Sequence, residues 1–161
     1  MSARLATVEE AEQLWKIRNQ ALREGCKDVY SADALLAWTP DLMPEGYRGV
    51  VLTNPFFVVD DESGSFPVAT GFLDLAENSI EALFTLPEYC GKGFATEIIA
   101  AIKREAIKRG IRQLKLSSTP NAFTFYQRQG FTLVKETVYH SASAGALPCM
   151  EMAINLPEQP E

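Results

Sequence analysis

A glycine-rich turn, Cys90-Gly91-Lys92-Gly93-Phe94-Ala95, separates a strand-like run from a long amphipathic helix pattern. The run 80–86 is apolar and ends before Pro87, which cannot donate a ladder hydrogen bond and is typical of a strand end. After the turn, apolar residues recur at helical spacing as far as Gly110: Phe94, Ile98, Ile99, Ile102, Ala106 and Ile107. The segment therefore predicts a strand, a tight turn and a helix in succession.

The start of this helix is a candidate anion site. Glycine lets the chain turn tightly and lie close to a ligand, and the first helical N–H groups have no partner within the helix. Such donors at the positive end of a helix bind phosphate. The P-loop pattern does not fit, because the earlier glycine and the hydroxyl residue are missing, and the dinucleotide pattern lacks its third glycine. A helix that follows glycine for steric reasons alone is the alternative.

Two segments of the chain resemble the GNAT acetyltransferases. Residues 81–95 resemble motif A of that family, which ends in Q/R-x-x-G-x-G/A and holds the pyrophosphate of coenzyme A. Residues 121–131 resemble the family's NA…FY…GF segment, at the family's spacing of one helix and one strand. In the N-terminal half, residues 27–38 resemble a bacterial YafP-like subgroup. The resemblance implies acetyl transfer from acetyl-CoA to an amine.

Length and composition fit one domain with its own core. The chain has 161 residues, of which 47% are hydrophobic. We expect the domain to cover residues 1–156, followed by a flexible tail, 157–161, made of Pro, Glu and Gln. A homodimer is compatible with the sequence.

Charge and cysteine usage narrow the partners and the compartment. The net charge of −6 argues against nucleic acid and anionic membrane as partners. No apolar run is long enough to span a bilayer, and no signal-peptide core follows the first residues. The three cysteines are widely spaced and His140 is the single histidine, so we predict no metal site and a reducing, cytoplasmic location.

The remaining pattern predicts an α/β (α+β mixed) fold. Hairpin strands come first and a strand–helix–strand unit later, which predicts a mixed sheet with helices on both faces. The resemblance implies a GNAT-like, mostly antiparallel sheet of six to seven strands. We expect helices near 8–25, 31–38, 94–109 and 121–128, a bulge or close backbone approach at Gly71, and an ambiguous stretch at 41–55. Expected strands are 4–6, 56–59, 68–75, 80–86, 114–117, 131–139 and 149–154.

The resemblance also implies which residues bind coenzyme A. Phe84, Thr85 and Leu86 are expected to hold the pantetheine arm through their backbone, and one N–H is expected to polarise the acetyl oxygen; an ordinary sheet edge is the alternative. Asn121 matches a position that contacts the cofactor and is equally a helix N-cap after Pro120. The pyrophosphate is expected on the turn and the first helical residues: Gly91, Lys92, Gly93, Phe94, Ala95 and Thr96.

Acetyl transfer to an amine requires a neutral amine, a polarised carbonyl and a protonated leaving thiolate. Tyr126 matches the family's general acid; a core aromatic is the alternative. Glu81 matches a carboxylate that accepts the amine's proton through water, with Asp74 as the rival. The expected acceptor pocket is formed by Tyr30, Trp38, Asp74 and Glu81.

Cys90 departs from the motif, which usually has Gln or Arg at this position. Its place at a helix N-terminus beside Lys92 predicts a lowered thiol pKa, and an inert packed thiol is the alternative. No cysteine is placed for an acyl-enzyme, so direct attack in a ternary complex is expected, with a small primary amine favoured over a protein. A non-catalytic module that binds acyl-CoA or a small ligand is the alternative function.

Overall fold

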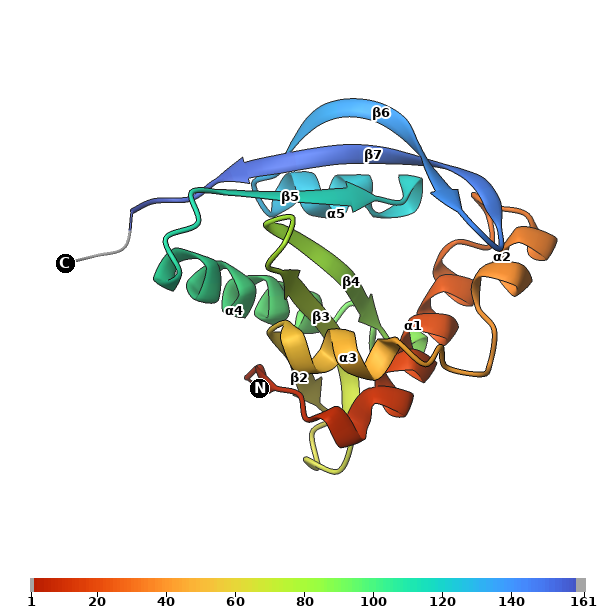
Figure 1. Ribbon diagram of the computed structural model, residues 1–161, viewed down its shortest axis with the longest axis horizontal. Helices are drawn as coiled ribbons and strands as arrows, with labels where there is room; N and C mark the ends of the chain where they lie inside the picture. The colour runs from red at the N-terminus through yellow and green to blue at the C-terminus, as the bar shows by residue number, and fades with distance from the viewer. Residues whose placement is uncertain (1, 159–161) are drawn as a thin grey trace.

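Seven strands form one sheet in the computed structural model, which describes residues 2–158 (Figure 1). Their order is β1-β2-β3-β4-β5-β7-β6. Only β4 and β5 are parallel, and every other neighbouring pair is antiparallel. The expected mixed, mostly antiparallel sheet is confirmed. The strands are β1 (Arg4–Leu5), β2 (Phe56–Asp60), β3 (Pro67–Asp74), β4 (Ser79–Thr85), β5 (Gln113–Ser118), β6 (Thr132–Ser141) and β7 (Gly145–Asn155).

Five α-helices accompany the sheet: α1 (Ala11–Gly25), α2 (Ala32–Trp38), α3 (Tyr47–Thr53), α4 (Phe94–Lys108) and α5 (Phe123–Arg128). The chain also has three short 3-10 turns. Val8–Glu10 precedes α1, Pro87–Tyr89 precedes the glycine turn that leads into α4, and Pro120–Ala122 precedes α5. The ambiguous stretch 41–55 therefore contains one further helix, α3. Among the described residues, no helix combines the length and apolarity needed to cross a membrane.

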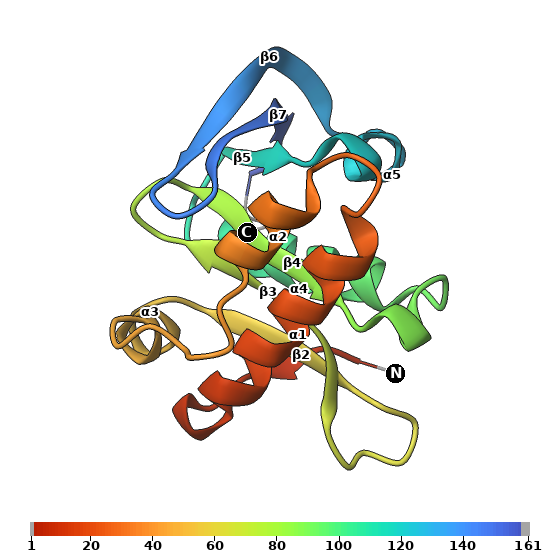
Figure 2. The same cartoon turned by 90° about the vertical axis from the view of Figure 1, so that its right-hand side faces the viewer.

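The helices cover both faces of the sheet, as expected. On one face, α4 packs Ile98 and Ile102 against a core that includes Val59. On the other, α1 packs Leu14 against a core that includes Val58. Because neighbouring residues of a strand point to opposite faces, Val58 and Val59 show that α1 and α4 lie on opposite sides of β2. Val51 of α3 belongs to the same core as Leu14, so α3 lies on the α1 face, and Figure 2 shows α1 in front of the sheet.

Strands β4 and β5 separate soon after they begin. Their one ladder pair joins Ser79 to Lys115, and Figure 1 shows the two strands diverging beyond it. A bulge in β4 adds to this divergence, because Ala82 has a positive φ of 53° and the register with β3 shifts there. Gly71 faces the bulge, where a Cβ would lie 3.0 Å from side-chain atoms of both Leu83 and Ile98. The expected bulge and close approach at Gly71 are both confirmed.

The C-terminal strands are longer than expected. Strand β7 begins at Gly145 rather than near 149 and contains Pro148, a residue that argues against a central strand. Pro148 is tolerated because β5 pairs with β7 only from Met150 onward, so its missing N–H breaks no bond to β5. In the expected tail, the Glu158 carboxylate accepts a hydrogen bond from Arg112 Nη1 at 3.0 Å, and residues 159–161 lie outside the described residues.

Candidate active site

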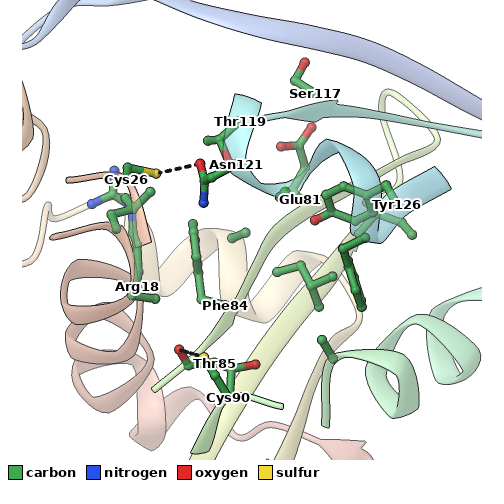
Figure 3. Close-up of a pocket in the computed structure, with 18 of the residues that line it drawn as sticks. Arg18, Cys26, Glu81, Phe84, Thr85, Cys90, Ser117, Thr119, Asn121 and Tyr126 are labelled. Atoms are coloured by element: carbon green, nitrogen blue, oxygen red, sulfur yellow. Dashed lines mark hydrogen bonds between the residues drawn. The ribbon is translucent and has the colours of Figure 1, made fainter. Parts of the chain in front are cut away.

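A cavity of about 1030 Å³ occupies the space where β4 and β5 diverge (Figure 3). Residues from α1, β4, β5, the N-terminus of α4 and α5 line it. Thirteen of the fifteen residues expected in the site lie on its wall, and the two exceptions are Leu86 and Lys92. The thirteen are Tyr30, Trp38, Asp74, Glu81, Phe84, Thr85, Gly91, Gly93, Phe94, Ala95, Thr96, Asn121 and Tyr126.

The two exceptions have other contacts. The N–H of Leu86 donates to the Val68 carbonyl at 2.8 Å, so it is not available to hold a pantetheine arm. Lys92 places its ammonium 5.4 Å from the centre of the Tyr89 ring. Neither residue lines the cavity. The expected contact of Lys92 with the phosphates stays a prediction, and Leu86 has no free N–H to hold the pantetheine arm. Phe84 and Thr85 are the strand residues left for that role.

The glycine turn forms an open cradle at the start of α4. Gly91 and Gly93 have φ values of 80° and 84°, a region that L side chains rarely adopt. The first helical bond runs from the Glu97 N–H to the Gly93 carbonyl at 3.1 Å, which leaves the three preceding N–H groups outside the helical ladder. A Cβ at Gly93 would meet no atom within 4 Å. Free donors and empty space together fit a bound phosphate.

Tyr126 combines packing with a position on the cavity wall. Its side chain is only 8% exposed, and its ring lies edge-on to Phe125 and Phe131, with centroid distances of 5.3 and 6.0 Å. Burial raises the pKa of the phenol, and the charge of Glu81 raises it further. In Figure 3 the phenol oxygen points toward the interior of the cavity. The phenol is thus held in its protonated form beside a carboxylate.

Glu81 is the better placed of the two candidate bases. The Ser79 hydroxyl donates to Glu81 Oε1 at 2.9 Å, and burial raises the pKa of the carboxyl, as do the nearby charges of Asp74 and Glu77. Asp74 is occupied, because its Oδ1 accepts the N–H groups of Ala76 and Glu77 at 2.9 and 3.3 Å. A carboxylate with a raised pKa is a stronger base near neutral pH.

The raised pKa of Glu81 predicts a stability difference that depends on pH. Above the ordinary glutamate pKa of 4.5, the folded state retains a proton that the unfolded state loses, so stability decreases as pH rises. We expect Glu81→Gln to melt at the same temperature as the wild type near pH 4 and above it at pH 8, measured by circular dichroism. Glu62→Gln, on the exposed hairpin loop, should change neither value. A Glu81→Gln protein that melts below the wild type at pH 8 would contradict the raised pKa.

Aromatic side chains form the end of the cavity near α2. The Tyr30 hydroxyl donates to the Pro148 carbonyl at 2.6 Å, and burial raises the pKa of Tyr30 to about 12. The Trp38 ring lies 5.9 Å from the rings of both Tyr30 and Tyr139. This contact joins α2 to the β6–β7 hairpin at the expected acceptor end.

Sequence reasoning missed one charged residue at this end, Arg18 of α1. Its guanidinium lies 4.3 Å from the centre of the Trp15 ring, and its Nη1 donates to Asn19 Oδ1 at 2.8 Å and to the Trp38 carbonyl at 3.0 Å. The available signal was its position, because Arg18 is a charged residue on the apolar face of a helix. Other missed residues on the wall are Cys26, Ser117, Thr119, Tyr139 and Cys149.

Asn121 lies in the cavity but is not the N-cap that the sequence predicts. The N-cap position of the 3-10 turn belongs to Thr119, because Pro120 begins the turn. The Cys26 thiol donates to Asn121 Oδ1 at 3.5 Å, which holds the amide from the α1 side. Burial raises the pKa of Cys26, so this thiol stays protonated and remains a donor.

Cys90 does not have the lowered pKa that its position predicts. Partial burial raises the pKa of the thiol, and the charge of Glu88 raises it further. The thiol contacts the carbonyl oxygens of Leu86 and Thr85 at 3.7 and 3.9 Å. Partial burial and the acidic neighbour outweigh the effect of the helix N-terminus on this pKa.

Exposure alone should still make Cys90 the most reactive thiol, because Cys26 and Cys149 are buried. We expect iodoacetamide to label Cys90 first, at a rate that continues to rise above pH 9, and saturating coenzyme A to slow this labelling. Mass spectrometry of timed samples measures all three cysteines. Labelling that reaches a plateau near pH 7 would indicate a lowered pKa, and labelling indifferent to coenzyme A would place Cys90 outside the bound ligand.

Comparison with known proteins identifies relatives of this chain. Residues 26–152 match the family model described as acetyltransferase (GNAT) domain. The chain is 38% identical over 69 residues to an uncharacterized acetyltransferase of Streptococcus pyogenes serotype M1, a match that covers 40% of this chain and 48% of that protein. The chain therefore spans about half the length of the curated relatives it matches.

Solved structures share the fold over nearly the whole chain. A GCN5-related N-acetyltransferase from Rhodopseudomonas palustris has a TM-score of 0.87 at 20% identity, with 96% of this chain and 95% of that chain covered. The PaiA N-acetyltransferase from Thermoplasma acidophilum, solved in complex with coenzyme A, has a TM-score of 0.75 at 18% identity, with 96% and 98% covered.

Proposed function

The chain belongs to the GNAT acetyltransferase family, and we propose that it transfers an acetyl group from acetyl-CoA to a small primary amine by direct attack. The observation that carries this proposal is one cavity that joins the glycine cradle to Glu81 and Tyr126. An anion site, a base and an acid are the groups that such a transfer requires. A coenzyme A complex of a protein with the same fold supports the choice of donor.

Each group has a distinct role in the proposed reaction. Bound acetyl-CoA supplies the acetyl group as a thioester, held by the cradle and by the backbone of Phe84 and Thr85. Glu81 accepts a proton from the acceptor amine through a water molecule, which leaves a neutral nitrogen able to attack. An N–H of Phe84 or Thr85 polarises the acetyl oxygen. Tyr126 donates its proton to the departing sulfur as the carbon–sulfur bond breaks, and the proton that the new amide nitrogen loses returns to the Tyr126 oxygen.

Direct attack is favoured over an acyl-enzyme because no cysteine suits that role among residues 2–158. Burial raises the pKa values of Cys26 and Cys149, and Cys90 is also shifted upward. A thiol that stays protonated is a poor nucleophile. The three unpaired cysteines also support a reducing location, which we propose is the cytoplasm.

A small acceptor is favoured by the aromatic side chains that line one end of the cavity. Tyr30 and Trp38 contact the β6–β7 hairpin there. Both residues lie in 27–38, the segment whose resemblance suggests the YafP-like subgroup. One copy of the chain supplies every residue of the proposed reaction, and a homodimer stays a prediction.

Release of free thiol tests the function against the alternative, a binding module without turnover. The protein is incubated with acetyl-CoA and a panel of small amines and short peptides, and coenzyme A is followed with a thiol reagent. Thiol release that depends on a small amine, with N-acetylated product, is expected. Binding of acetyl-CoA in calorimetry without thiol release for any small amine or peptide would favour the binding module.

A further inference from the structure

One basic side chain, Arg18, stands on the wall of the cavity in the part of the chain that the structure describes. The other charged groups on that wall are two carboxylates, Asp74 and Glu81. Figure 3 shows Arg18 on α1, on the opposite side of the drawn cavity from Tyr126. The acceptor end therefore carries one positive group and the catalytic end carries negative ones.

The Arg18 guanidinium has no acidic partner within residues 2–158, because none of the ion pairs there includes it. Its Nη1 is used by Asn19 and Trp38, whereas Nη2 and Nε make no hydrogen bond to a described residue. The side chain is partly buried, and burial lowers its pKa. Burying a cation without an anion is unfavourable, so the protein gains stability when an anion binds there.

The guanidinium is also held rigidly. Its central carbon, Cζ, lies over the Trp15 ring at 4.3 Å from the ring centre and over the Trp38 ring at 5.6 Å. Asn19, which accepts from it, is itself fixed because its amide donates to the Pro40 carbonyl at 2.8 Å. A planar guanidinium held in one orientation, with donors to spare, is suited to binding a carboxylate through two hydrogen bonds.

We propose that Arg18 binds a carboxylate of the acceptor, so that the amine acetylated is an amino acid or a similar small amine that carries a carboxylate. This inference rests on the proposed function, because it specifies the acceptor of that reaction. The amine of such a molecule faces Glu81 while its carboxylate faces Arg18, and the aromatic end around Trp38 and Tyr139 accommodates an apolar side chain. A polyamine is disfavoured, because it would place a second cation beside Arg18.

Intrinsic fluorescence can test this without turnover, because Trp15 and Trp38 are the two tryptophans of the chain and both contact Arg18. The protein, saturated with coenzyme A, is titrated with L-leucine, L-methionine and L-phenylalanine and with the amide of each. We expect the wild type to bind the acids about tenfold or more tightly than the amides. Arg18→Gln should remove this preference, and Arg18→Lys should retain part of it.

A matched control separates recognition from structure. Arg23 is also on α1; it holds the segment just after α2, through Thr39 and Asp41, as Arg18 holds the end of α2, but it does not line the cavity. Arg23→Gln should leave the ratio of acid to amide affinity unchanged. If Arg18 only ties α1 to α2, Arg18→Gln will weaken acid and amide equally, which would overturn the proposal. If Arg18→Gln does not fold, the ratio of acid to amide affinity is measured in Arg18→Lys, where a ratio equal to that of the wild type would overturn the proposal.

Turnover of the same ligands distinguishes failure of this inference from failure of the proposed function. If acids and amides are acetylated with equal KM, the proposed acetyl transfer is supported and the proposed binding of a carboxylate by Arg18 is wrong. A binding preference that depends on Arg18, without thiol release from any ligand, would support the anion site and overturn the transferase. The expected result is a preference for acids that appears in KM for the acceptor and disappears in Arg18→Gln.

Discussion

Tyr126→Phe is expected to lower kcat by about 100-fold and to change the Kd for acetyl-CoA by less than about twofold. The variant removes one hydroxyl and keeps the ring that packs beside Phe125 and Phe131. Without that hydroxyl, the departing thiolate has no proton donor, and this loss affects the transition state rather than the bound ground state. Thiol release under saturating substrates measures kcat, and calorimetry measures Kd.

The pKa shift of Tyr126 adds a second expectation. Because burial and the charge of Glu81 raise the pKa of the phenol above its ordinary value of 10.0, wild-type kcat should not decrease between pH 8 and pH 10 through loss of this proton. Tyr47→Phe is the matched control, since Tyr47 is a tyrosine outside the cavity whose pKa burial raises to about 12. It should keep wild-type kcat. Full turnover in Tyr126→Phe would show that Tyr126 is only a packing residue.

Gly93→Val is expected to weaken coenzyme A binding by about 100-fold, which corresponds to losing one or two hydrogen bonds to a charged group. Gly93 has a φ of 84°, which a β-branched residue does not adopt without strain. If the backbone at position 93 shifts to relieve that strain, the first N–H groups of α4 no longer point together toward the phosphate. Apart from the neighbouring residues of the turn, no protein atom lies within 4 Å of the added Cβ, so the new side chain meets a bound phosphate rather than the rest of the protein.

Gly110→Val controls for the strain itself. Gly110 follows the other end of α4, has a φ of 80°, and a Cβ added there would likewise meet no atom within 4 Å. Both variants should lose comparable stability in thermal melts, and only Gly93→Val should lose affinity for coenzyme A in calorimetry. Equal affinity in the two variants would mean that the cradle does not bind the pyrophosphate.

Local patterns determined much of this protein. The strand, glycine turn and helix from 80 to 109 are visible in the sequence, because hydrophobic period and glycine placement act over a few neighbouring residues. The same holds for Thr7-Val8-Glu9-Glu10, a capping-box sequence: the structure forms the box on the 3-10 turn Val8–Glu10, where the Thr7 N–H donates to Glu10 Oε1 at 2.9 Å. The resemblance to the GNAT family further implied that Glu81, Asn121 and Tyr126 belong to the site, and all three line one cavity.

Tertiary structure decided the properties that depend on distant neighbours. Arg18 reaches the cavity only because α1 packs beside β4, and Asn121 is held by Cys26, a residue 95 positions away. The sequence places Cys90 beside a helix N-terminus, but partial burial and Glu88 set the direction of its pKa shift. A local pattern specifies which backbone conformation a segment prefers. Desolvation, charge and cavity shape depend on which segments lie next to one another. Here the divergence of β4 from β5 opens the space in which residues of α1, α4 and α5 come together.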